Sequence, residues 1–217
     1  VGKLIGLEEA VGLIREGDHV MVGGFLGCGS PDLLIDALVK KGTGKLTLYS
    51  NDTGFVDRGV GKLVVSRQFA AINTSHIGTN KETGRQMLAG ETQVNLVPQG
   101  TLAEQIRAGG HGLGGILTRT GVGTLVEEGK QVVMVDGEKF LLEKPIRANI
   151  ALIFADSADE NGNLSYRGAT RNFNVIMAAA ADITIAQVRR VVKVGEMNPN
   201  DVVVPGVFVN YLVREEN

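Results

Sequence analysis

Short apolar, β-rich runs alternate with polar loops and segments of helical periodicity through the first half of the chain. The runs His19–Val22, Leu46–Tyr49, Ala70–Thr74 and Val94–Val97 have the length and composition of buried strands. Polar or glycine-containing turns follow them, such as the segment 50–53 after the second run. A repeated order of strand, loop and helix is typical of a parallel sheet with helices on its faces.

Helix boundaries are predicted from capping residues. Ser30 is a good N-cap and Pro31 suits the first helical position, while Gly42 stops the helix. Between them, apolar residues recur at helical spacing, at Leu33, Leu34, Ala37 and Leu38. Thr101, with Glu104 three residues later, reads as a capping box, so a second helix is expected over Thr101–Ala108.

The second half of the chain begins with five glycines between Gly109 and Gly115, which we interpret as an irregular segment. The dipeptide Asp136-Gly137 then predicts a tight hairpin. The expected elements are hairpin strands at Gln131–Val135 and Glu138–Leu142, strands at Ile150–Phe154, Ile183–Ala186 and Val202–Val209, and a helix around Val175–Ala181. No internal repeat and no long linker is evident. We therefore expect one α/β domain over residues 1–217, an open, mostly parallel, doubly wound sheet with a small hairpin excursion.

The loop from Gly23 to Gly29 joins a predicted strand to a predicted helix. Glycines let backbone N–H groups approach a ligand, and a helix N-terminus favours an anion or a developing oxyanion. The loop lacks both the Gly-Lys-Ser/Thr ending of a P-loop and the G-x-G-x-x-G spacing. The one literal G-x-G-x-x-G, at Gly110, Gly112 and Gly115, follows a helix and is therefore interpreted as a flexible or closely packed loop. A tight turn without a ligand is the alternative for the first loop.

Composition excludes several classes of function. A net charge of −2 gives no basic footprint for nucleic acid, and no apolar run approaches the roughly twenty residues that cross a membrane. The start of the chain lacks a signal-peptide core, and a lone Cys28 suits a reducing compartment, so we expect a cytoplasmic protein. Three His and one Cys lack metal-ligand spacing, so no metal is expected.

The motifs, taken in order, resemble those of the class I 3-oxoacid CoA-transferases. The stretch Glu16 to Phe25, followed by Gly27, Gly29 and Pro31, is similar to the first signature of that family, with Glu16 where Asp or Asn is preferred. The resemblance continues through the segments 50–53, 75–80, 97–101, 107–110, 118–124, 171–174 and 205–206. They resemble the α (A) subunit of two-subunit enzymes such as the bacterial acetate/butyrate–acetoacetate CoA-transferases.

The resemblance implies transfer of CoA between short-chain carboxylates through a glutamyl-CoA thioester. It also implies that the nucleophilic Glu lies on a β (B) subunit, in a Ser-Glu-Asn-Gly motif, so this chain is expected to be inactive alone. The sequence Asp159-Glu160-Asn161-Gly162 imitates that motif with the wrong neighbours. Its polar composition is typical of an exposed turn rather than a desolvated pocket, and we expect Glu160 at the surface.

The same resemblance assigns the candidate site. The CoA- and oxyanion-binding loop is Gly23, Gly24, Phe25, Leu26, Gly27, Cys28 and Gly29, and the substrate-positioning residues are Asn51, Gln99 and His76. No tightly bound cofactor is expected, with coenzyme A or acyl-CoA as substrate. For Asn51, Gln99 and His76 the alternative is a structural role within their own loops. We expect Cys28 to be a packed thiol, because its nearest His in sequence, His19, lies at the far end of the preceding strand.

Two further functions remain open at this point. A sugar-phosphate isomerase of the same general fold would use the glycine loop for phosphate, and would need its own acid/base carboxylate. A non-catalytic CoA-binding or assembly subunit would only stabilise a partner. The expected partners under the first hypothesis are a β subunit in an α₂β₂ assembly, acyl-CoA and small carboxylates.

Overall fold

The fold is a twisted, mostly parallel sheet, seen in a computed structural model that describes residues 3–215. Its strand order is β11-β10-β8-β1-β2-β3-β4, with β9 paired to β8, and only the β8–β9 pairing is antiparallel among the described strands of this sheet. The strands are β1 (His19–Val22), β2 (Leu46–Asp52), β3 (Phe69–His76), β4 (Gln93–Leu96), β8 (Ala148–Asp159), β9 (Leu164–Ser165), β10 (Ala181–Val192) and β11 (Tyr211–Arg214). The predicted parallel α/β architecture is confirmed.

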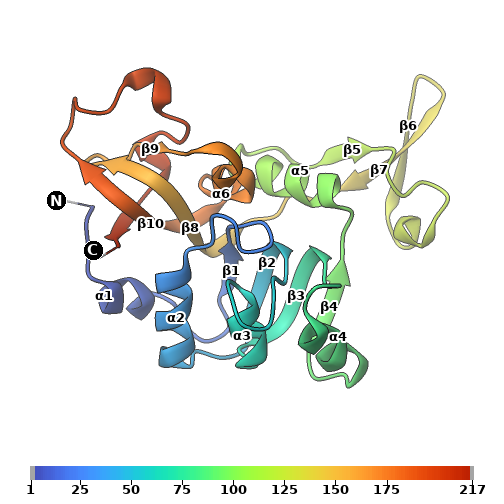
Figure 1. Ribbon diagram of the computed structural model, residues 1–217. Coiled ribbons are helices and arrows are strands. Elements are labelled where there is room, and N and C mark those ends of the chain that lie inside the picture. The colour runs from blue at the N-terminus through green and yellow to red at the C-terminus, as the bar shows by residue number, and fades with distance from the viewer. Residues whose placement is uncertain (1–2, 216–217) are drawn as a thin grey trace.

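Helices cover both faces of the sheet (Figure 1). On one face lie α1 (Leu7–Gly12), α2 (Asp32–Lys41), α3 (Gly61–Val65) and α4 (Lys81–Leu88); on the other lie α5 (Gln99–Gly110) and α6 (Asn172–Met177). Two apolar cores result, because side chains alternate across each strand. Val20 and Val22 of β1 belong to the core beneath α1–α3, whereas Met21 between them belongs to the core beneath α5 and α6.

The direction in which successive strands are added to the sheet reverses beside β1. The chain runs outward from β1 through β2, β3 and β4, and then returns to place β8, β10 and β11 on the other side of β1. Ligands of such sheets bind beyond the carboxyl ends of the strands at this reversal. The loop that follows β1, Gly23 to Gly29, therefore occupies the topologically favoured position.

A small antiparallel sheet projects from the body as an arm (Figure 1). It consists of β5 (Ile116–Thr118), β6 (Gln131–Val135) and β7 (Glu138–Glu143) in the order β5-β7-β6, with the 3-10 turn η1 (Leu125–Glu127) in the connection. Asp136 and Gly137 have φ values of 48° and 82°, as a type I′ turn requires. The predicted hairpin is confirmed, and β5 adds a third strand that the sequence patterns do not predict.

The helix after the glycine loop begins later than predicted, and Ser30 does not cap it. Helix α2 begins at Asp32, without a side-chain cap from its own flank. Its first-turn amides of Leu33 and Leu34 instead donate to Gln187 Oε1, at 2.9 and 3.4 Å. A distant residue of β10 thus supplies the missing acceptor. The predicted stop is confirmed, since Gly42 caps the helix in the left-handed region.

The predicted capping box of the fifth helix is wrong. Helix α5 begins at Gln99, directly after Pro98, so Thr101 lies within the helix. The helix also continues through Gly109 and Gly110, where the sequence predicts an irregular segment. Close packing explains these glycines, because a methyl group built on Gly109 would lie 1.9 Å from the Ile146 carbonyl oxygen.

Three C-terminal predictions also need correction. Helix α6 begins at Asn172 rather than near Val175 and ends at Met177, so Ala181 already starts β10. Residues 202–209 form no regular strand: part of this segment is the 3-10 turn η4 (Gly206–Phe208), and η3 (Pro199–Asp201) precedes it. The last described strand is β11. A 3-10 turn, η2 (Gly168–Thr170), immediately precedes α6.

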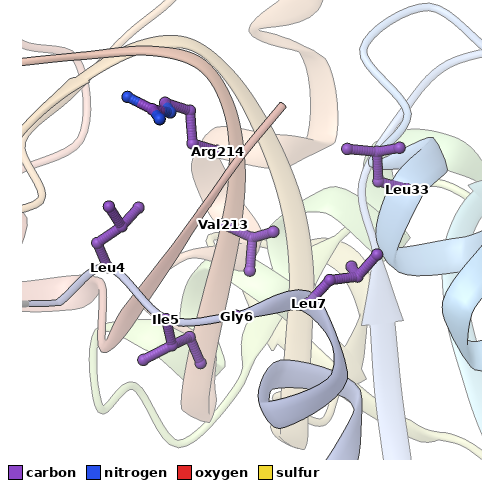
Figure 2. Close-up of a pocket in the computed structure, with 7 residues that line it drawn as sticks. All are labelled: Leu4, Ile5, Gly6, Leu7, Leu33, Val213 and Arg214. Carbon is purple, nitrogen blue, oxygen red and sulfur yellow. The ribbon is translucent and has the colours of Figure 1, made fainter. Parts of the chain in front are cut away.

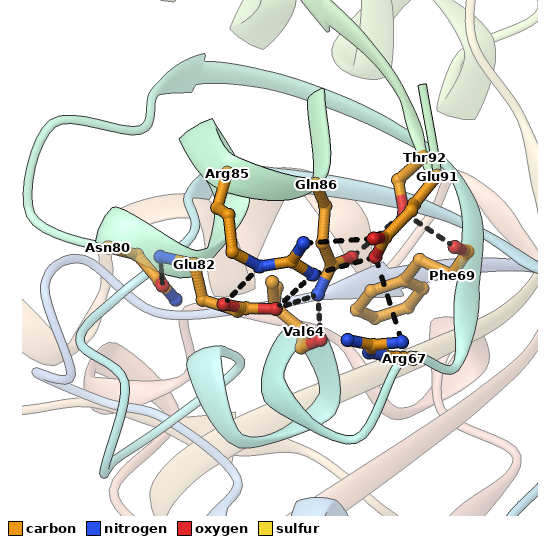
Figure 3. Close-up of polar contacts among 9 residues, drawn as sticks. All are labelled: Val64, Arg67, Phe69, Asn80, Glu82, Arg85, Gln86, Glu91 and Thr92. Carbon is orange, nitrogen blue, oxygen red and sulfur yellow. Dashed lines mark hydrogen bonds and ion pairs between the residues drawn. The ribbon is translucent and has the colours of Figure 1, made fainter. Parts of the chain in front are cut away.

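Polar contacts connect α4 to the segments packed around it (Figure 3). Buried Asn80 caps α4 by accepting from Glu82 N at 3.2 Å, and its Nδ2 donates to the Thr53 carbonyl at 2.8 Å. Gln86, also buried, donates to the Val64 carbonyl at 2.8 Å. The Asn80 bond ties the segment after β2 to α4, and the Gln86 bond ties α4 to α3.

Candidate functional site at the carboxyl ends of β1 and β2

The glycine loop folds back on itself directly after β1. Phe25 and Cys28 exchange two backbone hydrogen bonds, at 3.0 and 2.9 Å. The loop has positive φ at Gly24, Leu26, Gly27 and Gly29, of which only Leu26 carries a side chain. Glycine is needed at the other three positions because a Cβ disfavours this region.

Gly23 is required by packing rather than by its φ angle. A methyl group built there would lie 1.8 Å from Asn174 Oδ1. Asn174 is fully buried, accepts from Phe154 N at 2.9 Å, and donates to the carbonyls of Gly29 (3.0 Å) and Thr170 (2.9 Å). The base of the loop is therefore held against α6 by one asparagine.

A second asparagine of α6 holds the tip. Asn172 Oδ1 accepts from Gly24 N at 3.2 Å, and its Nδ2 donates to the Cys28 carbonyl at 3.0 Å. Sequence reasoning assigned Asn172 and Asn174 no role beyond membership in a motif. The only local signal was their spacing of two residues within the motif at 171–174.

Most amides of the loop are already engaged within the chain. Gly24 N donates to Asn172, Leu26 N to Asp52, and the amides of Phe25 and Cys28 to each other's carbonyls. Within residues 3–215, the amides of Gly27 and Gly29 donate to no other atom. These two amides are therefore the remaining candidates for donation to a ligand, whereas the sequence prediction included the whole loop from Gly23 to Gly29.

Gly27 and Gly29 border a hollow of about 280 Å³. Its other walls are Ser30, Asp32, Leu33, Phe154, Gln187, Arg189 and Glu215. Arg189 lies 5.0 Å over the Phe154 ring and bonds Asp156 Oδ1 at 3.0 Å. Burial raises the pKa of the Asp32 carboxyl, against the opposing charge of Lys62. The hollow thus combines the Arg189 guanidinium with a carboxyl, that of Asp32, whose pKa is raised by burial.

A second loop has the same local pattern as the first. Gly54-Phe55-Val56-Asp57-Arg58-Gly59 follows β2 as Gly24-Phe25-Leu26-Gly27-Cys28-Gly29 follows β1, and each has a bridge between its Phe and the residue three positions on. The loops touch: methyl groups built on Gly27 and Gly59 would lie 3.5 Å from Arg58 Cδ and 2.9 Å from Ser30 Oγ. The shared Gly-Phe-x-x-x-Gly pattern was a signal that could have revealed this pair.

Asn51 and Gln99 come together beside the loops. Gln99 Nε2 donates to Asn51 Oδ1 at 2.5 Å, and Asn51 Nδ2 donates to Asp52 Oδ2 at 2.6 Å. Asn51 is buried whereas Gln99 is exposed, so the contact links the interior to the surface. Asn51 and Asp52 both belong to β2, which runs three residues further than predicted.

The remaining candidates occupy separate positions. His76 ends β3 on the neighbouring strand, in register with Asp52, and its side chain is exposed. Cys28 is exposed, so the predicted packed thiol is wrong, because the loop turns its tip away from the core. Glu160 is an exposed turn residue after β8, as predicted, and its amide donates to the Val192 carbonyl at 3.1 Å.

Another hollow, of about 350 Å³, lies at the N-terminal segment (Figure 2). It is lined by Leu4, Ile5, Gly6, Leu7, Leu33, Val213 and Arg214. Arg214 is the one charged side chain in this lining, so the hollow offers little to a polar reaction. Across residues 3–215, no group of three or more His, Cys, Asp or Glu side chains is arranged to hold a metal ion, and no helix is long and apolar enough to cross a membrane.

Comparison with known proteins decides the family. A family model described as coenzyme A transferase matches residues 5–215. The chain belongs to the coenzyme A transferase family. It is 52% identical over 211 residues to the acetate CoA-transferase subunit alpha of Escherichia coli K12, covering 97% of this chain and 96% of the relative. It is 44% identical over 213 residues, 98% of each chain, to the acetoacetyl-CoA:acetate/butyrate CoA transferase alpha subunit of Clostridium acetobutylicum.

The fold agrees with this membership. An acyl-CoA transferase structure from Escherichia coli O157:H7 superimposes with a TM-score of 0.89 at 23% identity, over 99% of this chain. This chain spans 47% of that longer protein. The resemblance to CoA-transferase α subunits drawn from the motifs is confirmed. The relatives described above are all CoA-transferases or their subunits, and they give no support to the sugar-phosphate isomerase alternative.

Proposed function

We propose that this chain, as a single domain, is the α subunit of a CoA-transferase that moves CoA between short-chain carboxylates such as acetate, butyrate and acetoacetate. The observation that carries the proposal is the 52% and 44% sequence identity, over nearly the whole chain, to alpha subunits whose names specify acetate and acetoacetyl-CoA. The partner is a β subunit, in an α₂β₂ assembly in the cytoplasm. Acyl-CoA is a substrate, and no cofactor is tightly bound.

The site supports a role that prepares the reaction but does not supply its nucleophile. Asp52 is buried beneath three donors, and Glu160 is exposed in a turn, so neither is a desolvated, free carboxylate. The nucleophilic Glu is contributed by the partner. The loop from Gly23 to Gly29 forms a wall of the shared site.

Within that wall, the amides of Gly27 and Gly29 are the donors available to an acyl oxygen as negative charge develops on it. The exposed amide of Gln99, backed by Asn51, orients the substrate carboxylate or acyl carbonyl. His76 flanks the same edge from β3. Loss of one such donor typically lowers kcat by about 10²–10³-fold.

Co-expression with the cognate β subunit tests the proposal. The pair is expected to transfer CoA from acetoacetyl-CoA to acetate, whereas each chain alone is inactive. Hydroxylamine trapping during turnover, followed by intact mass measurement of both chains, should place the modification on the β subunit. Turnover by this chain alone, or a modification on it, would contradict the assignment.

A further inference from the structure

One buried carboxylate connects the two parts of the site. Asp52, the last residue of β2, is only 4% exposed. Its Oδ2 accepts from Asn51 Nδ2 at 2.6 Å and from Leu26 N at 3.0 Å. Its Oδ1 accepts from Gly54 N at 2.7 Å. The three donors come from β2 itself and from both loops, so a single side chain ties all of them together.

The carboxylate sets the direction of the amide chain beside it. Asn and Gln side chains have nearly the same shape in either orientation, and their neighbours decide which end is oxygen. An ionised carboxylate only accepts, so Asn51 must turn its nitrogen toward Asp52 and its oxygen toward residue 99. Gln99 must then turn its nitrogen toward Asn51. Among the described residues 3–215, the Gln99 Oε1 and second N–H have no other partner, so both are left for a ligand.

The same carboxylate fixes the glycine loop. Leu26 has a φ of 47°, unfavourable for a residue with a side chain, and its amide is held by Asp52 at 3.0 Å. Gly27, the next residue, carries one of the two amides that stay unengaged within residues 3–215. Movement of Asp52 would therefore release the Leu26 amide and remove the acceptor that orients Asn51 and Gln99.

We propose that Asp52 is a positioning residue, which sets the hydrogen-bond direction of Asn51 and Gln99 and holds the loop at Leu26. The inference rests on the proposed function, because it concerns how that site is oriented. Asp52 touches no reacting atom in it. It acts through the groups that do.

The variant Asp52→Asn, in the co-expressed complex, removes the acceptor without changing the shape. The amide nitrogen introduced at residue 52 takes the place of either Oδ1, where it faces the Gly54 N–H, or Oδ2, where it faces Asn51 Nδ2 and the Leu26 N–H. In either orientation a hydrogen-bond donor faces another donor. We expect kcat to fall on the order of 10–100-fold, as for other supporting residues, with little change in the KM for acyl-CoA. Asp182→Asn is the matched control, since Asp182 pairs with Arg147 at the surface.

The double variant Asn51→Asp/Asp52→Asn separates orientation from mere packing. The carboxylate introduced at position 51 would again accept from Gln99 Nε2, so the direction at residue 99 is restored while the contact to Leu26 N is not. We expect part of the lost kcat to return. Equal kcat in wild type and Asp52→Asn, or no recovery in the double variant, would overturn the proposal.

A measurement on the unmodified complex covers the case in which the variants fail to fold. The side-chain ¹⁵N–¹H resonance of the Asn51 proton that faces Asp52 should be shifted downfield and protected from exchange; an unshifted, rapidly exchanging proton refutes the inference. This readout is independent of turnover. A wild-type complex without CoA transfer would therefore count against the proposed function, whereas the resonance still decides the role of Asp52.

Discussion

Replacing Gly23 with alanine tests how tightly the glycine loop is held against α6. The new methyl group would lie 1.8 Å from Asn174 Oδ1 and 2.7 Å from its Cγ, so the asparagine must move. Moving it strains the packing, at about 1–3 kcal/mol, and leaves a buried partner such as Phe154 N unsatisfied, at about 1–3 kcal/mol. We expect the free energy of unfolding to fall by about 2–6 kcal/mol.

Denaturant unfolding of the full chain and a double-mutant cycle measure this effect. In an Asn174→Ala background the methyl group has room, so Gly23→Ala should cost much less, with a coupling free energy of about 1–3 kcal/mol. Gly84→Ala is the matched control: Gly84 lies within α4 with nothing near its Cβ position, and alanine should stabilise by about 0.5–1 kcal/mol. A Gly23→Ala cost that is small, or is the same in both backgrounds, would refute the steric reasoning.

Three other outcomes are expected. Arg85 lowers the pKa of Glu82 to about 2, below its unfolded value of about 4.3 (Figure 3). The stabilisation of the folded state by the ionised Glu82 is therefore fully present above about pH 5 and is lost as the pH falls toward 2. In a plot of Tm against pH, Glu82→Gln should show a smaller loss of Tm than the wild type over this acidic range. Gly137→Ala should destabilise by about 1 kcal/mol or more, measured by denaturant unfolding, because its φ is 82°. Exposed Cys28 should react with one equivalent of a maleimide without denaturant, by mass spectrometry, and bound acyl-CoA should slow that reaction.

Patterns that are local in sequence predicted the fold well. The β1 run, the Asp136-Gly137 turn and the Gly42 stop each depend on backbone preferences of a few neighbouring residues, and each is confirmed. Strand and helix ends were less predictable when a distant group decided them. Gln187 takes the place of Ser30 as the cap of α2. No residue near Ser30 in the sequence indicates this contact, because Gln187 lies far along the chain.

The candidate site, too, was predictable in its location but not in its long-range contacts. Its positions were predictable, because polar and glycine-rich residues follow predicted parallel strands whose carboxyl ends share one edge. Which of its hydrogen-bond donors are already engaged within the chain was not predictable. Which amides of the loop remain for a ligand depends on Asn172 and Asp52, which lie 148 and 26 residues from the amides that they hold.

The sequence by itself determined most strands of the parallel sheet, the glycine loop and the family to which they belong, because these follow from short-range backbone chemistry and ordered motifs. The tertiary structure alone decided that Asn174 forbids a side chain at residue 23, that Asp52 joins the loop to Asn51, and that Gly27 and Gly29 keep amides unengaged within residues 3–215. The reason is physical. A buried polar group must find a partner wherever the folded chain brings one, and sequence distance does not limit that choice.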